Sequence, residues 1–380
     1  MPPVRVLSLD NVATILKNLD VEDVLANQAK AFNAYSAKQT QTPQRVNLET
    51  NSHTTLVMPS RIDTLTSVIK VVSIPKQDSK NGLPGVTLVM DNNTGEPRGL
   101  VNARLLTAIR TAAGSALATR AIFSTPSKKN KGSTPLTLVV FGSGAQAKAH
   151  IQLLTHVLPQ ITTVIICNRT LPRALDLLTE LQPQYSNKIE ISAFSMSTGE
   201  SKGASSSLSS GQQPKDQLKR IVQSADIICT CTNSLEALFP GEWVKPGAHI
   251  NMVGSFKPHM HEVDQTLIKR AFTVVDAQNE CQEEAGELIL AIKESGYDGI
   301  LTELGQIFDE QGQLNASALP SQFSSLPSSI DCKESSSQTT GPHRDVSIFK
   351  SVGIAAQDVA ITSLVLDKAE TMDLGSVVEI

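Results

Sequence analysis

The sequence lacks the features that mark membrane, secreted and nucleic-acid-binding proteins. No window approaches the apolar length that spans a bilayer, and the N-terminus MPPVRVLSLDNVATIL has no basic segment before a long apolar run. No run of lysine and arginine of the kind that binds nucleic acids appears, and the formal net charge of -4 is small for 380 residues. We therefore expect a cytoplasmic protein with a small-molecule partner, and neither a nucleic acid nor a membrane as partner.

Cysteine is scarce and follows no pairing pattern. The five cysteines are odd in number and form no C-x-x-C pair; they are Cys167, Cys229, Cys231, Cys281 and Cys332. Cys167 and Cys229 lie inside apolar, strand-like runs. This usage is typical of reduced, mostly buried thiols in a cytosolic protein.

Two common kinds of catalytic site are also missing. No G-x-S-x-G string appears, so no nucleophilic serine is indicated. His259 and His261 could suggest a metal, but no third ligand with zinc-type spacing lies nearby, and loop histidines usually have no such role. We predict no metal site.

The length fits two globular units. The first mixes a helix over 21–35 with β-branched runs at TTLVMP, SVIKVVSIP and GVTLVMD, separated by Pro, Gly and Asn turns, which predicts an α+β unit. The Ala- and Leu-rich stretch LVNARLLTAIRTAAGSALATRAIF then predicts one long helix leading out of this unit.

After a polar linker over 124–135, apolar strands alternate with helical segments. The strands are TLVVFGSG, TTVIICNRT, ADIICTCT, AHINMVG and FTVVDAQ. This alternation predicts a doubly wound parallel sheet of the Rossmann type. The segment DVSIFKSVGIAAQDVAITSLVLDKAE predicts a strand and a terminal helix, which could close the second unit or return to the first.

Two segments are too polar for a compact core. Residues 195–214 (SMSTGESKGASSSLSSGQQP) and about 319–342 are rich in Ser, Gly and Pro. Such segments cannot bury enough apolar surface to offset the entropy lost on ordering. We interpret both as disordered surface insertions.

A glycine-rich turn gives the clearest functional signal. Gly142, Gly144, Ala145, Gln146 and Ala147 follow an apolar strand and open a helix. Gly142 permits a tight turn, Gly144 leaves room for a pyrophosphate, and the helix N-terminus offers free N–H groups. The alternative is a small-residue turn without a ligand. The context favours a dinucleotide site.

The end of the next strand indicates which dinucleotide binds. An NAD enzyme would carry an acidic residue there for the ribose 2′-hydroxyl, but this strand ends at Asn168, Arg169 and Thr170. A cation and hydrogen-bonding groups suit a 2′-phosphate. We predict NADP(H), with NAD(H) as the second choice; an exposed arginine without a ligand is the alternative.

Several strings together resemble the ornithine cyclodeaminase and mu-crystallin family. They are DNNTGEPRGLVNARLLTAIRTAAGSALATRA, FGSGAQAKAH, ADIICTCTNS, PGAHINMVGSFKPHMHEVD and FKSVGIAAQDVA. The resemblance runs from about Arg45 to the C-terminus, apart from the two insertions. It implies a substrate-binding, homodimer-forming domain of residues 1–122 and 345–380, which pairs its sheet edge across a two-fold axis. It also implies an inserted NADP-binding Rossmann domain of residues 123–344.

The resemblance also assigns residues to roles. Lys70 matches the family's active-site lysine, Arg45 resembles its carboxylate-binding arginine, and Arg110 resembles the arginine near the nicotinamide and the substrate carboxylate. Cationic side chains suit an imino or amino acid, whose carboxylate must be fixed to orient its α-carbon. Alone, Lys70 could be an edge-strand solubiliser.

Five further positions correspond to cofactor contacts in the family: Thr87, Thr230, Asn251, Val253 and Ser351. Thr230 and Asn251 end predicted strands, where a doubly wound sheet places its ligand crevice. A turn-forming or capping role is the alternative for each.

One departure separates the possible reactions. The cyclodeaminases of this family carry an aspartate shortly after Val-Gly, as acid and base, whereas here Val253 and Gly254 lead to Phe256. A phenyl ring cannot transfer a proton. The resemblance therefore implies an NADPH-dependent oxidoreductase of cyclic ketimine carboxylates that forms proline or pipecolate. The alternatives are an ornithine cyclodeaminase and a noncatalytic, NADPH-dependent ligand-binding protein of the mu-crystallin kind.

Overall fold

The computed structural model describes residues 3–76, 83–125, 128, 134–185, 188–203, 213–294, 297, 299, 301–315, 317 and 344–379. The chain forms two compact units. Unit 1 comprises Met1–Gly114, Leu304–Asn315 and Gly353–Ile380, and unit 2 comprises Ser115–Glu303 and Ala316–Val352. Within the described ranges, no helix is both long and apolar enough to traverse a lipid bilayer.

Unit 1 is built on a mixed sheet of eight strands, in the order β17-β1-β7-β6-β5-β4-β2, with β3 also paired to β4. β1 and β7 run parallel, and β4, β5, β6 and β7 run antiparallel to their neighbours in that series. The strands are β1 (Val4–Leu7), β2 (Thr40–Gln41), β3 (Val46–Glu49), β4 (His53–Ile62), β5 (Ser67–Pro75), β6 (Gly85–Met90), β7 (Pro97–Asn102) and β17 (Ser376–Val378).

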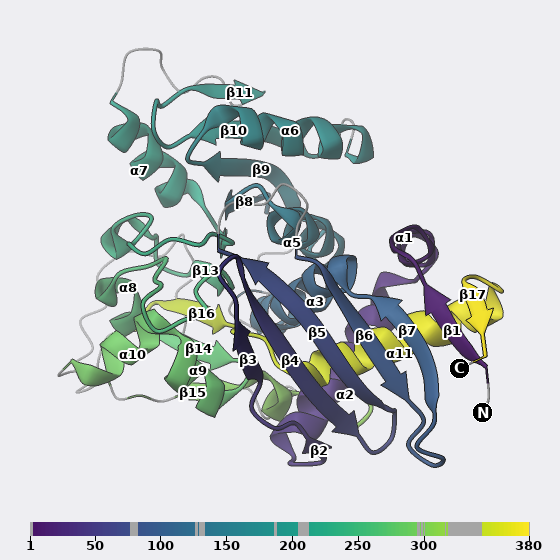
Figure 1. Ribbon diagram of the computed structural model, residues 1–380. Helices are drawn as coiled ribbons and strands as arrows, with labels where there is room; N and C mark the ends of the chain where they lie inside the picture. Colours follow the sequence, from purple (N-terminus) through teal and green to yellow (C-terminus); the bar gives the residue numbers. More distant parts are fainter. Residues whose placement is uncertain are drawn as a thin grey trace. The chain divides into compact units, whose positions relative to one another are not determined.

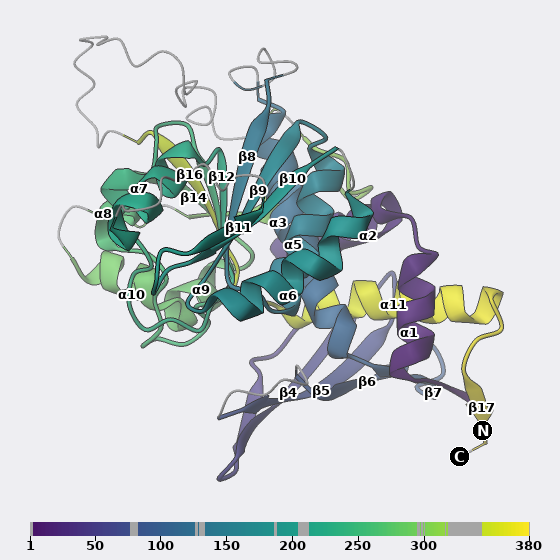
Figure 2. The same ribbon diagram turned by 90° about the horizontal axis from the view of Figure 1, so that it is seen from above.

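The helices of unit 1 begin at side-chain caps or pack against the sheet. Ser8 caps α1 by accepting a hydrogen bond from the N–H of Asn11, and Asp20 caps α2 by accepting one from Glu22. The C-terminal helix α11 lies along the sheet over β4 to β7 (Figures 1 and 2). The elements are α1 (Leu9–Lys17), α2 (Val21–Ser36), the start of α3 (Arg104–Phe123), η3 (Leu304–Ile307) and α11 (Ala355–Thr371).

The strand β5 shows why this sheet has two different faces. Successive side chains of a strand point to opposite faces. Val68, Lys70 and Val72 are buried, whereas Ile69 is exposed and Val71 is half-buried. Val72 packs with Ala355 of α11, so the buried face is the one that α11 covers. A lysine in an apolar run therefore points to the interior of unit 1.

Unit 2 contains a nine-stranded sheet in the order β11-β10-β9-β8-β12-β13-β16-β14-β15. All neighbouring strands run parallel except β10 and β11. The chain order reverses between β8 and β12, which is the switch point of a doubly wound fold. The strands are β8 (Leu136–Phe141), β9 (Ile161–Asn168), β10 (Glu190–Ser195), β11 (Ser201–Gly203), β12 (Ile227–Thr230), β13 (His249–Met252), β14 (Ala271–Val275), β15 (Leu301–Glu303) and β16 (Val346–Lys350).

Helices flank both faces of this sheet (Figure 2). They are the end of α3, α5 (Ala145–Val157), α6 (Leu171–Leu181), η1 (Gln182–Gln184), α7 (Pro214–Ser224), η2 (Gly241–Trp243), α8 (Gln265–Lys269), α9 (Gln278–Glu284) and α10 (Gly286–Lys293). A large cluster of buried apolar side chains, including Phe141, Ile250 and Ile348, forms the core. The predicted Rossmann-type sheet is confirmed.

The two compact units have bounds that differ from those of the predicted domains. Along the chain, unit 1 ends at residue 114 and unit 2 begins at residue 115, inside α3, whereas the predicted boundary is at residues 122 and 123. The strand at 346–350 belongs to unit 2, and only the helix after it belongs to unit 1, because β16 pairs with β13 and β14. Residues 304–315 also belong to unit 1.

The first expected insertion begins later than residue 195. Ser195 ends β10, residues 201–203 form β11 on the edge of β10, and Pro214 begins α7. Polar residues form this short strand because the backbone of β10 offers hydrogen-bonding partners regardless of side chain. Residues 204–212 and the second expected insertion, 319–342, lie outside the described residues.

Candidate functional site

The glycine-rich turn of unit 2 requires glycine at its first position. Gly142 has a φ of 108°, and a Cβ added there would lie 2.6 Å from the carbonyl oxygen of Cys231. Its N–H donates a 2.8 Å hydrogen bond to the carbonyl of Cys167. The turn therefore lies between the carboxyl ends of β9 and β12, beside the switch point of the sheet.

The next glycine leaves open space before a helix. A Cβ added at Gly144 would meet no described atom within 4 Å. Gly144 is the N-cap of α5, and no side chain caps the first turn, which contains Ala145 and Gln146. Uncapped N–H groups and the helix dipole favour an anion at this position. These residues fit the pyrophosphate of a dinucleotide.

The end of β9 carries no acid. The side-chain N–H of Asn168 donates to the carbonyl of Thr170 at 2.9 Å, which closes the local turn. The backbone carbonyl of Arg169 accepts hydrogen bonds from Ser195 and Ser197. The Arg169 side chain is exposed, and its guanidinium pairs with no carboxylate of the described residues. This cation is therefore available to a phosphate.

Three polar side chains predicted to contact the cofactor make internal hydrogen bonds. The hydroxyl of Thr230 donates to Glu262 at 2.8 Å, and the hydroxyl of Ser351 donates to Asp276 at 2.6 Å. The amide of Asn251 donates to Thr119 at 3.0 Å. Their contact with a nucleotide, like that of half-buried Val253, stays a prediction. The observed bonds fix the carboxyl ends of β12, β13 and β16.

Sequence reasoning missed the acid that organises this edge of the sheet. Glu262 is fully buried, and its carboxylate accepts hydrogen bonds from Thr230, from the N–H and hydroxyl of Thr232, and from the N–H of Gly254. Burial raises the pKa of Glu262 above its usual range. A Cβ at Gly254 would lie 2.0 Å from the carbonyl oxygen of Thr232, so the two loops cross closely here.

Unit 1 contains a second group of buried charges, centred on Lys70. The Lys70 ammonium donates a 2.9 Å hydrogen bond to Oδ1 of Asp358 on α11, and the two side chains are 1% and 2% exposed. Sequence reasoning missed Asp358, although it lies in the string FKSVGIAAQDVA. Most of its neighbours in the sequence of the helix are apolar, and its partner Lys70 is 288 residues away along the sequence. The fold alone brings the pair together.

Arg110 of α3 completes a buried cationic group. Its Nε lies 3.5 Å from Oδ1 of Asp358, and its Nη1 donates to the side-chain oxygen of Gln357 at 2.8 Å. Gln357 returns a hydrogen bond to the Arg110 carbonyl, and its own carbonyl accepts one from buried Gln28. The guanidinium also packs across Gly353, where a Cβ would lie 2.6 Å from Nη1. Arg110 is therefore held in one orientation.

The other predicted residues of unit 1 lie close to Lys70. Thr87 on β6 is buried and stands opposite Lys70 in the register of the sheet. Arg45 precedes β3, is half-buried, and acts electrostatically on Lys70. The structure thus brings the three predicted catalytic residues, Lys70, Arg45 and Arg110, together.

Burial controls the acidity of this lysine. Loss of hydration on burial lowers the pKa of Lys70 from 10.5 to about 8; Asp358 opposes the fall, and the charges of Arg110 and Arg45 add to it. A lysine with this pKa can give up a proton near neutral pH more readily than an exposed one. This site can bind an anion and deliver a proton.

Phe256 and the two histidines singled out in the sequence, His259 and His261, lie outside the buried groups of charges described above. Phe256 is half-buried and packs against the core of unit 2. His259 is exposed and His261 is half-buried. Within the described ranges of the chain, no group of three His, Cys, Asp or Glu side chains is arranged to hold a metal ion.

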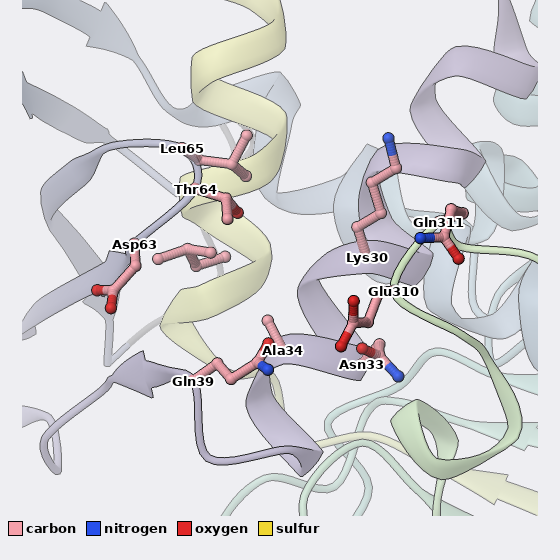
Figure 3. Close-up of a pocket in the computed structure, with 10 residues that line it drawn as sticks. Lys30, Asn33, Ala34, Gln39, Asp63, Thr64, Leu65, Glu310 and Gln311 are labelled. Carbon is pink, nitrogen blue, oxygen red and sulfur yellow. The ribbon is translucent and has the colours of Figure 1, made fainter.

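A cavity of about 600 Å³ opens in unit 1, away from the predicted residues. Figure 3 shows the turn between β4 and β5 on one side and α2 with the segment after η3 on the other. Its lining residues are Lys30, Asn33, Ala34, Gln39, Ile62, Asp63, Thr64, Leu65, Glu310 and Gln311. None of the predicted site residues lines it.

Comparisons with known proteins find relatives that match most of the chain. The chain is 29% identical to a Delta(1)-pyrroline-2-carboxylate reductase from a strain of Bacillus cereus, over 96% of this chain and 97% of the relative. It is 28% identical to the ketimine reductase mu-crystallin of Rattus norvegicus, over 80% of this chain and 76% of the relative.

Solved structures share the fold over the whole chain. A Thermococcus litoralis Delta(1)-pyrroline-2-carboxylate reductase in complex with NADH and L-proline gives a TM-score of 0.75 at 22% identity, covering 98% of this chain and 99% of that one. An archaeal alanine dehydrogenase dimer with bound NAD gives 0.73 at 21% identity, covering 100% and 99%. The family model for the ornithine cyclodeaminase/mu-crystallin family matches residues 5–205 and 213–323, and the chain belongs to that family.

Proposed function

We propose that this protein is an NADPH-dependent reductase of cyclic ketimine carboxylates. Its substrates would be pyrroline-2-carboxylate or piperideine-2-carboxylate, and its products proline or pipecolate. The observation that carries the proposal is the buried group of Lys70, Arg110 and Asp358, with Arg45 acting on it. Relatives named as reductases of such imines cover most of the chain and support it.

The cofactor would bind to unit 2. Bound NADPH supplies the hydride. Gly142 and Gly144 would let the backbone approach the pyrophosphate, and the uncapped first turn of α5 would donate N–H groups to it. Arg169 would pair with the 2′-phosphate, because its guanidinium is exposed and the end of β9 has no acid to repel that group.

The substrate carboxylate would bind to the cations of unit 1. Arg110 is oriented by Gln357 and Asp358, and its planar guanidinium carries more N–H donors than these two contacts use. Arg45 and Lys70 would complete the anion site. A carboxylate fixed in this way leaves the imine carbon little freedom to turn. Lys70 would also keep the imine nitrogen protonated.

The same geometry argues against ring closure with loss of ammonia. That reaction needs a group to take the proton of a terminal amine, and Phe256 packs its ring against the core of unit 2 instead. Purified protein should therefore oxidise NADPH stoichiometrically with a ketimine carboxylate. Release of ammonia from ornithine with catalytic amounts of cofactor would identify a cyclodeaminase instead.

The protein would act as a homodimer, with the interface on a face of the sheet of unit 1 and not, as expected from the sequence, at the edge of that sheet. On the sheet face opposite α11, Ile69, Leu88 and Leu100 stand opposite one another on three adjacent strands. Ile69 is 39% exposed and Leu100 is 36% exposed. Such an apolar row favours burial by a second copy, and a related fold is described as a dimer. Light scattering that reports a monomer at micromolar concentration would contradict this.

We place the protein in the cytoplasm. The described cysteines, Cys167, Cys229, Cys231 and Cys281, are free thiols, and burial raises the pKa of each. Protonated, buried thiols react poorly. Recovery of the protein in a secreted fraction would contradict this location.

A further inference from the structure

The carboxylate of Asp358 is only half used. Its Oδ1 accepts a hydrogen bond from Lys70 at 2.9 Å and lies 3.5 Å from Nε of Arg110. Its Oδ2 is buried and has no hydrogen-bond partner among the described residues. A charged oxygen buried without a donor is unfavourable, and native proteins rarely keep one without a purpose. The free oxygen indicates a missing N–H or O–H group.

The charges around Asp358 define what kind of molecule could supply that group. Lys70, Arg110 and Arg45 provide three positive charges, and Asp358 provides one negative charge within direct reach of Lys70 and Arg110. A ligand that complements this group carries a carboxylate and, close to it, a protonated nitrogen. An α-iminium carboxylate and a cyclic α-amino acid both have this form, whereas a simple carboxylate does not.

We propose that Oδ2 of Asp358 accepts the N–H of the substrate's protonated ring nitrogen, and so selects the iminium form of the ketimine. This rests on the proposed function. Arg110 and Arg45 then bind the carboxylate on the adjacent carbon. Asp358 makes this contact from α11, which is held in place by the hydrogen bonds of Gln357 with Arg110 and Gln28.

The proposed contact accounts for the protons of the reaction. The π bond of the protonated C=N group breaks, a C–H bond forms with the hydride from NADPH, and the π electron pair moves to nitrogen. The nitrogen, still bound to Asp358 through its N–H, takes a second proton from the Lys70 ammonium. Solvent then returns a proton to Lys70. The product leaves as the zwitterionic cyclic amino acid.

Binding of two product analogues tests the contact without turnover. L-Proline has a protonated ring nitrogen, and tetrahydrofuran-2-carboxylate has an ether oxygen in the same place. We expect the wild-type full chain with saturating NADP⁺ to prefer L-proline in calorimetry by about 10- to 100-fold, as for a hydrogen bond to a charged group. Asp358→Asn should reduce this preference to roughly threefold or less, since an uncharged acceptor gains far less from the cation.

A matched control separates this effect from a general loss of a buried acid. Asp345 is also buried and pairs with an arginine, Arg270, at 2.7 Å in unit 2. Asp345→Asn should leave the preference for L-proline unchanged. The proposal would be overturned if Asp358→Asn lowered the affinity for both ligands equally, or if it kept the wild-type preference for L-proline.

Two additions keep the test decisive. If Asp358→Asn does not fold, Lys70→Met with Asp358→Asn removes both charges and leaves neither unpaired. A retained preference for L-proline in that variant would contradict the proposal. Wild-type protein that binds neither compound would contradict the proposed function itself, whereas selective binding that the substitutions leave intact contradicts only the role of Asp358.

Discussion

Each of the two units buries a lysine beside an acid, but the two carboxylates differ in how many of their oxygens accept hydrogen bonds. In unit 2, the Lys350 ammonium donates to Glu287 at 3.1 Å and to the carbonyl of Ser255, while the second oxygen of Glu287 accepts the hydroxyl of Ser255. In unit 1, Lys70 bonds one oxygen of Asp358 and leaves the other without a donor among the described residues. In the first pair both carboxylate oxygens have hydrogen-bond donors from the protein, so we call this pair saturated; in the second pair one oxygen has no such donor among the described residues.

The difference indicates what each pair does. A saturated buried pair fixes the backbone around it, here the loop that contains Ser255. An unsaturated pair with spare donors and acceptors is prepared for a ligand. Similar residues therefore serve structure in one unit and binding in the other, and their substitution should separate the two roles.

The largest effect should come from Lys70→Met. Reduction of pyrroline-2-carboxylate should fall by roughly 1000-fold or more, because the anion site and the proton source are lost together. NADPH affinity, measured by fluorescence titration, should stay within about twofold, because Lys70 belongs to unit 1. Asp358 keeps Arg110 as a cationic neighbour, so the variant should still fold. Equal losses of turnover and cofactor affinity would contradict the assignment of Lys70 to substrate binding alone.

The state of Lys70 should also be visible in the wild-type pH profile. Its lowered pKa of about 8 means that the ammonium is present below that pH and is lost as the pH rises through it. The kcat/KM for reduction should therefore fall with rising pH in this range. In Asp358→Asn the fall should occur at lower pH, because Asp358 raises the pKa of Lys70. If kcat/KM fell at the same pH in Asp358→Asn as in the wild type, the fall would reflect the titration of another group.

Lys350→Met should act mainly on stability. Glu287 would lose its cation while fully buried, which typically costs about 3–5 kcal/mol of unfolding free energy. The double variant Lys350→Met with Glu287→Met should recover much of this loss, since no charge is left unpaired. Urea denaturation measures both. A single variant as stable as the wild type would show that the saturated pair contributes nothing to unit 2.

The smallest expected effect concerns cofactor choice in unit 2. Arg169→Ala should weaken NADPH binding by about 1.5–3 kcal/mol and leave NADH binding nearly unchanged, because only NADPH has a 2′-phosphate. Arg220→Ala, another exposed arginine of unit 2, controls for a general change in charge. Equal losses for both cofactors in Arg169→Ala would place the 2′-phosphate elsewhere.

The sequence predicted the features that depend on local pattern. The glycine turn lies between a strand and a helix. The sequence pattern predicts both of these elements, so Gly142 and Gly144 could be assigned in advance. Family resemblance identified Lys70, Arg45 and Arg110. The alternating burial of β5 then explains why a lysine in an apolar run is interior.

Features that depend on distant pairing were not predictable. Asp358 meets Lys70 only because α11 packs on β5, and one helix in an apolar string gives no sign of its partner. The strand β16 enters the sheet between β13 and β14, against the order of the sequence, so it could not be assigned to a unit in advance. Local periodicity carries no information on strand order.

The most direct test of the central claim is a paired assay on the purified protein. One arm follows NADPH oxidation with pyrroline-2-carboxylate, and the other follows ammonia release from ornithine with catalytic NADP⁺ or NAD⁺. We expect one NADPH consumed for each proline formed, and no ammonia. Ammonia and proline formed from ornithine without net cofactor turnover would contradict the account and assign the site to a cyclodeaminase.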